Sequence, residues 1–252
     1  MSKGFVLLIS SIPLESEKIS VGLKRVTTFK HSDKSLYKGK LSGCNILLIN
    51  SGIGKINAGH AATAMIENYP VSSVICFGIG GAYPSSGLGI GDIAVASKEI
   101  YGDEGVITSK GWSDIKEIGI PLFQKGRKRY FNEFPLDKKM VACAVSFFHL
   151  VSRHSELVEE SLVTNIKLGP FVTVSTVSGS AWRAREMERR FNAICENMEG
   201  AAVAHVCAMY GIPMAEIRGI SNIAGDRDKK KWDLKLAAEN CQSVVLEFLK
   251  KI

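Results

Sequence analysis

Short apolar runs alternate with helical patterns along most of the chain. Runs that end at turn residues predict buried strands at Phe5–Ile9, Ile46–Asn50, Val74–Gly78, Ile93–Ala96, Phe171–Val177 and Ala215–Ile220. The patterns between and after them predict helices at Asn57–Tyr69, Ala184–Phe191, Glu199–Tyr210 and Leu234–Leu249. Because strands alternate with helices, we expect an α/β fold, a three-layer α/β/α domain with a central mixed, mainly parallel sheet.

The chain shows no internal repeat, low-complexity segment or linker. Its 252 residues are 46% hydrophobic and 23% charged, which excludes a disordered chain, a collagen and a disulfide-stapled mini-protein. This length is sufficient for one large core, so we expect a single domain over residues 1–252. The stretch Phe147–Gly169 mixes charged residues with Leu and Val, and we expect it to form a surface insertion.

The net charge of +7 raises the question of a nucleic-acid partner. The basic residues are scattered through loop-like segments with acids between them, and the densest run is only Lys229–Lys231. This distribution favours a solvated surface, so we expect no nucleic acid as a partner.

The six cysteines form no C-x-x-C pair, and no histidine stands at the spacing of a zinc site. We therefore expect no metal ion. The apolar run near the start lacks the cleavage site of a signal peptide, and no run approaches the roughly 18 apolar residues of a membrane-spanning helix. We expect a cytoplasmic protein that does not contact a membrane.

Two glycine clusters follow predicted strands. Ser51–Lys55 differs from a P-loop, because Ile49 stands where the motif has its first glycine and Ile56 where it has Ser or Thr. The second cluster contains Gly80 and Gly81, and we expect a turn where a substrate approaches the backbone closely. A purely structural turn is the alternative.

Polar segments follow three further strand or helix boundaries. They are Ser11–Glu15, Asn197–Ala202 and Ile217–Asp228. Because a parallel sheet gathers the carboxyl ends of its strands at one edge, we expect these segments to meet there.

Together these motifs resemble the nucleoside phosphorylase and nucleosidase superfamily, from residue 5 to about residue 245. The motifs that carry the resemblance are Ser51–Lys55, Gly80-Gly81, Met198-Glu199 and Arg218 with Ser221-Asn222. The run from Ser221 to Asp228, with Trp232, is similar to the futalosine hydrolase branch. The resemblance implies hydrolysis of the N-glycosidic bond of futalosine to hypoxanthine and dehypoxanthine futalosine, in menaquinone biosynthesis. It also implies water as co-substrate, no cofactor, and a homodimer or larger homo-oligomer.

The resemblance assigns roles to the charged residues. Glu199 is expected to accept hydrogen bonds from the ribose hydroxyls, with Met198 packing on the sugar. Glu15 matches the glutamate that activates water, although Glu17 is only two residues on and is the alternative base. Arg218 matches the arginine that positions the water.

The same resemblance assigns residues to the base and to the 5′ extension. Asn222, next to Ser221, replaces the Asp of the adenine-releasing enzymes and favours a 6-oxopurine such as hypoxanthine, because an amide donates a hydrogen bond but no proton. Thr176 and Val177 match the segment that packs on the base. Arg227 is a candidate for the carboxylate of the 5′ extension, and a structural pair with a neighbouring Asp is the alternative.

Three other functions remain open. A methylthioadenosine/S-adenosylhomocysteine nucleosidase would release adenine, and a purine nucleoside phosphorylase would need phosphate. A binding protein without activity is the third, and a salt-dependent affinity for DNA would support it.

Overall fold

A central mixed sheet organises the structure, a computed structural model that describes residues 4–31, 34–151 and 165–252. Within these residues the sheet has ten strands, in the order β11-β6-β12-β13-β5-β1-β4-β3-β2, and β14 pairs with both β5 and β6. The strands are β1 (Phe5–Ser10), β2 (Lys24–His31), β3 (Lys34–Leu41), β4 (Cys44–Asn50), β5 (Val71–Ala82), β6 (Ile93–Tyr101), β11 (Glu133–Pro135), β12 (Ile166–Thr173), β13 (Cys195–Asn197) and β14 (Met214–Ile223). Strands β4, β1, β5 and β14 lie side by side in this order and are parallel to one another. Strand β3 pairs antiparallel with both β4 and β2.

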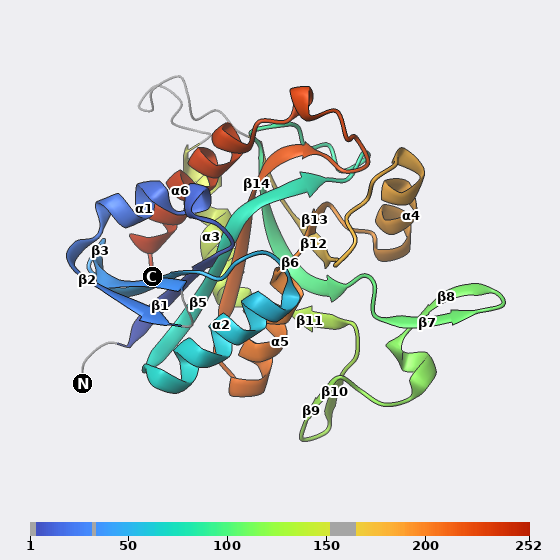
Figure 1. Cartoon of the computed structure of the whole chain (residues 1–252), viewed down its shortest axis with the longest axis horizontal. Helices are drawn as coiled ribbons and strands as arrows, with labels where there is room; N and C mark the ends of the chain where they lie inside the picture. Colours follow the sequence, from blue (N-terminus) through green and yellow to red (C-terminus); the bar gives the residue numbers. More distant parts are fainter. Residues whose placement is uncertain (1–3, 32–33, 152–164) are drawn as a thin grey trace.

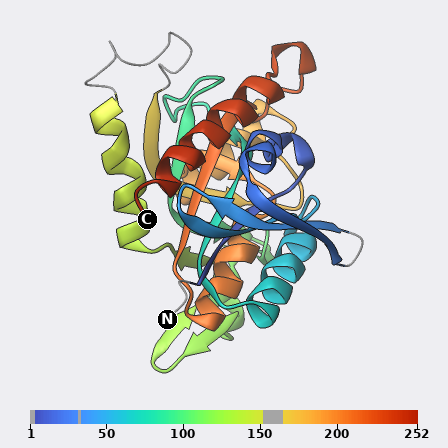
Figure 2. The same ribbon diagram turned by 90° about the vertical axis from the view of Figure 1, so that its left-hand side faces the viewer.

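Helices cover both faces of the sheet (Figures 1 and 2). They are α1 (Glu17–Gly22), α2 (Lys55–Asn68), α3 (Lys138–Val151), α4 (Ala181–Phe191), α5 (Gly200–Tyr210) and α6 (Leu234–Leu249). The red α6 lies beside α1 and α3 on one face, and α2 packs against α5 on the other. The expected three-layer α/β/α architecture is therefore confirmed.

The core follows from the apolar runs seen in the sequence. Strands β1 and β4 bury consecutive residues such as Leu7, Leu8 and Leu47 completely, as central strands covered on both faces do. Helix α5 buries mainly Ala and Val, and its small residues let it pack closely between the sheet and α2.

The bounds of the strand expected at Phe171–Val177 are wrong. Strand β12 runs over Ile166–Thr173, where it pairs with β6 and β13. After Thr173 the chain leaves the sheet, because Glu196 of β13 binds the backbone and the side chain of Ser178.

The turn expected at Gly80 and Gly81 is also wrong, because β5 continues to Ala82. It does so since β14 and β13 pair with this end of β5, with Ile220 opposite Gly80 and Glu196 opposite Gly81. A Cβ on Gly80 would lie 2.6 Å from Sγ of the buried Cys195, so close packing explains why this position holds a glycine.

Several elements were not predicted. The hairpin β2–β3 has a charged, alternating sequence, and short hairpins β7 (Gly105–Thr108) with β8 (Gly111–Asp114) and β9 (Phe123–Lys125) with β10 (Lys128–Tyr130) extend from the body in Figure 1. Helix α3 covers 147–151 and β12 begins at Ile166, so only part of the expected insertion 147–169 can be compared; 152–164 lie outside the described residues. Among the helices described, none has the length and apolar character that crossing a membrane requires.

Candidate active site

The peptide group of Ile79 in strand β5 joins two of the predicted site residues. Its N–H donates to Oε1 of Glu15 at 2.9 Å, and its carbonyl oxygen accepts from Nη1 of Arg218 at 3.2 Å. The same nitrogen of Arg218 lies 3.3 Å from Oε2 of Glu199. The structure thus brings Glu15, Arg218 and Glu199 into one buried cluster.

Glu15 is held by backbone donors on both of its oxygens. It ends the short 3-10 helix η1 (Pro13–Glu15) after β1, and its Oε2 accepts from the N–H groups of Ser11 and Ile12 at 2.7 and 3.1 Å. A Cβ on Gly78 would stand 2.5 Å from Oε1, so glycine lets this carboxyl reach β5. Burial raises the pKa of Glu15 above its usual value, although the Arg218 guanidinium and the backbone hydrogen bonds act against this. A fixed carboxylate with a raised pKa is suited to general-base chemistry.

Glu199 stands at the N-terminus of α5, directly after the half-buried Met198. Its Oε1 accepts from the N–H of Gly54 at 3.0 Å, and its Oε2 contacts Arg218. A carboxylate has about four acceptor positions. Two are used here, so two remain for a diol such as the ribose 2′- and 3′-hydroxyls.

Arg218 is the largest fully buried side chain among the described residues. Its Nε donates to Oε1 of Glu216 at 2.9 Å, while Nη1 faces Glu199. Burial alone would lower the pKa of Arg218, but the carboxylates of Glu216 and Glu199 outweigh it and the net shift is upward. The guanidinium therefore stays charged beside Glu199, the residue predicted to bind the ribose.

Asn222 lies near the end of β14, opposite Gly81 of β5. Its Oδ1 accepts from the hydroxyl of Ser221 at 2.9 Å, and its Nδ2 donates to the carbonyl of Ile223 at 3.1 Å. The second hydrogen on Nδ2 remains for another acceptor. A Cβ on Gly81 would be 3.4 Å from Nδ2, so this glycine leaves room beside the amide.

Thr176 and Val177 lie on an exposed segment after β12. The next residue, Ser178, is buried and donates from its N–H and its hydroxyl to Glu196 at 2.8 and 2.6 Å. Glu196 also accepts from the hydroxyl of Tyr83 at 3.2 Å. Sequence reasoning missed Glu196 as an anchor of this segment, although it stands only two residues before Met198.

Arg227 lies outside the buried cluster. It is exposed, with its guanidinium carbon 4.8 Å from the centre of the Trp232 ring. The alternative, a structural pair of Arg227 with Asp226 or Asp228, is absent from the ion pairs of the described residues, and Asp226 contacts Lys231 at 2.9 Å instead. Any contact of Arg227 with a substrate stays a prediction.

Glu17, the alternative base, is exposed at the start of α1. It lines a separate hollow of about 250 Å³ with Tyr37 and Asn50. The structure places Glu15, and not Glu17, beside Arg218.

A second buried carboxyl network was missed by sequence reasoning. Glu99 of β6 accepts from Thr173 and Asn197 at 2.7 Å each, and Glu216 of β14 accepts from Arg218. Both glutamates are completely buried. The available signal was a glutamate inside or next to an apolar strand pattern, since a charge is rarely buried without a partner.

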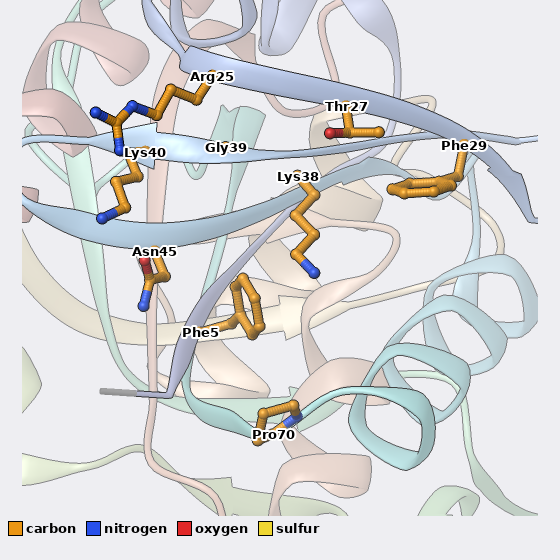
Figure 3. A pocket seen from close by; sticks show the side chains of 9 residues that line it. All are labelled: Phe5, Arg25, Thr27, Phe29, Lys38, Gly39, Lys40, Asn45 and Pro70. Carbon is orange, nitrogen blue, oxygen red and sulfur yellow. The ribbon is translucent and has the colours of Figure 1, made fainter. Parts of the chain in front are cut away.

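The open hollow of about 300 Å³ in Figure 3 lies elsewhere, on the hairpin β2–β3. Its charged lining residues are Arg25, Lys38 and Lys40, and Phe5 and Phe29 also line it. None of the predicted site residues lines it. We place the candidate site at the carboxylate and guanidinium cluster, because there, among the described residues, the predicted base Glu15 and the predicted ribose ligand Glu199 converge on Arg218.

The chain is similar to proteins of one known superfamily. The model of the phosphorylase superfamily matches residues 6–250. A futalosine hydrolase of Thermus thermophilus is 34% identical over 197 residues, which cover 78% of each chain. A 5′-methylthioadenosine/S-adenosylhomocysteine nucleosidase of Halalkalibacterium halodurans is 27% identical over 97% of each chain.

Solved structures show the same fold. The 5′-methylthioadenosine/S-adenosylhomocysteine nucleosidase of Neisseria meningitidis, in complex with methylthio-immucillin-A, has a TM-score of 0.80 at 24% identity and covers 98% of this chain and 99% of its own. The S-adenosylhomocysteine nucleosidase of Streptococcus pyogenes, in complex with 5-methylthiotubericidin, has a TM-score of 0.82 at 22% identity, with coverage of 100% and 98%. These relatives and neighbours are all named as hydrolases or nucleosidases.

Proposed function

The chain belongs to the phosphorylase superfamily, and we propose that within it the chain is a nucleosidase that hydrolyses futalosine to hypoxanthine and dehypoxanthine futalosine. The observation that carries this proposal is the cluster in which Glu15 and Arg218 bind one peptide group while Arg218 contacts Glu199. The proposed base and a fixed cation thus share one peptide group, and the cation contacts the proposed diol acceptor.

The reaction divides among these groups as follows. Glu199 accepts hydrogen bonds from the ribose hydroxyls and tolerates the positive charge that develops on the sugar. Glu15 removes a proton from water, the water oxygen bonds to C1′, and the bond from C1′ to the base breaks with its electron pair passing to the purine. The guanidinium of Arg218 orients the water. The purine takes up a proton from the solvent as it leaves, and Glu15 returns the proton that it took from water to the solvent.

Asn222 supports a 6-oxopurine as the leaving base. Its Nδ2 keeps one hydrogen available for N7, where negative charge builds as the bond breaks. An amide cannot transfer a proton, which suits hypoxanthine better than adenine. The 34% identity to a futalosine hydrolase supports the same choice.

A second candidate is a methylthioadenosine/S-adenosylhomocysteine nucleosidase, favoured by the 97% coverage of that relative. We would incubate the protein with futalosine, methylthioadenosine, S-adenosylhomocysteine and inosine, with and without phosphate, and identify the released base by chromatography. Hypoxanthine from futalosine without phosphate is the expected result. Adenine release would establish the second candidate, and a requirement for phosphate would establish a phosphorylase.

Replacing Asn222 with Asp should weaken the reaction with futalosine. In its ionised form the Asp has no donor for N7, and the loss of one hydrogen bond at a buried acceptor should lower kcat/KM by about 10- to 100-fold. The hydroxyl of Ser221 still has an oxygen to bind, so the local geometry is retained. Steady-state kinetics with futalosine and methylthioadenosine measures the change, and unchanged futalosine kinetics would remove Asn222 from the reaction.

The activity should rise with pH through the raised pKa of Glu15. Burial favours the neutral acid, so the catalytic carboxylate forms only above the ordinary value of 4.5. The acidic limb of kcat/KM is therefore expected to be centred above pH 4.5. Glu17→Gln serves as the control and should keep the same profile, whereas a limb centred at or below 4.5 would contradict the assignment.

A further inference from the structure

Two fully buried carboxyl groups face each other beneath the candidate site. A Cβ built on Gly200 would lie 2.3 Å from Oε2 of Glu216 and 2.3 Å from Oε1 of Glu99, so both oxygens border the same small space at the start of α5. Any residue larger than glycine at this position would displace them. The two carboxyls have come together from β14 and β6, far apart in the sequence.

The hydrogen bonds around the pair leave one oxygen without a donor. Both oxygens of Glu99 accept, one from Thr173 and one from Asn197, and Oε1 of Glu216 accepts from Arg218. Oε2 of Glu216 is buried and has no hydrogen-bond partner. Such an orphan is costly, unless a proton lies between it and the facing oxygen of Glu99.

The charges of the surroundings also require a proton. Four carboxyl groups interact electrostatically with the single guanidinium of Arg218. They are those of Glu15, Glu99, Glu199 and Glu216. Burial, and then the charge of Glu216, raise the pKa of Glu99 well above its usual value. Two adjacent carboxylates in a dry interior cannot both ionise at neutral pH.

We propose that Glu99 and Glu216 share one proton and act as a single positioning unit for Arg218 and Glu199. Through Glu216 the unit holds Nε of Arg218 and thereby turns Nη1 toward Glu199. Through Glu99 it holds the side chain of Asn197, whose Oδ1 accepts from the backbone N–H groups of Glu199 and Gly200 at 2.9 and 2.8 Å. One proton thus fixes the orientation of both groups, whose catalytic meaning rests on the proposed function.

The shared proton can be observed directly, without any substrate. Infrared spectroscopy at neutral pH should show the C=O stretch of a buried protonated carboxyl in the wild type. Glu216→Gln and Glu99→Gln should each abolish this band. Glu196→Gln is the matched control, because Glu196 is also buried but its carboxyl accepts hydrogen bonds from three donors. Absence of the band in the wild type, or its persistence in both Gln variants, would overturn the proposal.

Kinetics separates positioning from mere packing. In Glu216→Gln the amide nitrogen takes the place of Oε2 and donates to Glu99, so this variant should keep most of the wild-type kcat. Glu216→Ala releases Arg218 and should lower kcat by about 100-fold with a smaller change in KM, since misplacement of a reacting group has this effect. Equal activity of the Ala and Gln variants would contradict the positioning role. The substrate is whichever nucleoside the wild type cleaves, so a failure of the futalosine proposal would leave both tests intact.

Discussion

Glu15→Gln should lower kcat for base release by about 10²- to 10⁴-fold, the usual contribution of a general base. The amide cannot take a proton from water, although its size matches the carboxyl. Its nitrogen would also face a backbone N–H, because both oxygens of Glu15 accept from such groups. The measurement is the initial rate of hypoxanthine release at saturating futalosine, together with thermal unfolding to confirm that the variant is folded.

The matched control for this experiment is Glu17→Gln, two residues on. Glu17 is exposed and borders a separate hollow, so its variant should keep the wild-type rate. If Glu17→Gln loses activity and Glu15→Gln keeps it, the assignment of the base is reversed. If both variants keep it, neither glutamate activates water.

Arg218→Met should lower the free energy of unfolding by about 3–5 kcal/mol, the usual cost of removing one partner of a buried ion pair. Methionine fills much of the volume, but Glu216 and Glu199 lose the cation that lies 2.9 and 3.3 Å from their oxygens. Urea unfolding followed by circular dichroism measures the loss. Activity should fall as well, because the water loses its orienting group.

Two comparisons make this result specific. Lys231→Met removes an exposed partner of Asp226 and should leave the unfolding curve unchanged, because surface pairs contribute little. Adding Glu216→Gln to Arg218→Met should restore part of the stability, since one unpaired charge is removed. A loss of less than about 1 kcal/mol in the single variant would show that the carboxyls find protons or other donors.

The sequence was sufficient for the architecture because the central strands are apolar on both faces. Consecutive buried residues in β1, β4 and β14 produce a pattern that does not depend on distant partners. The end of β12 and the extension of β5 could not be read in this way. Both depend on pairing and side-chain anchors, such as Glu196 with Ser178, that form only when distant segments meet.

The candidate site shows the same division. Glu15, Glu199, Arg218 and Asn222 stand in motifs with a family pattern, so their residue types and spacing pointed to them. Glu99 and Glu216 lie within strands and belong to no such motif. Their importance comes from facing each other in a dry interior, which only the folded structure reveals.

The peptide group of Ile79 connects the base and the guanidinium through main-chain atoms alone. Substitution of residue 79 by anything other than proline, which has no N–H, therefore leaves the connection in place, and divergence among homologues can change this side chain without separating the two groups. Position 78 has no such freedom, because a side chain there would occupy the space of the Glu15 carboxyl. Two adjacent residues are thus under opposite constraints, and tolerance at one beside intolerance at the other is the pattern that a saturation mutagenesis scan should reveal.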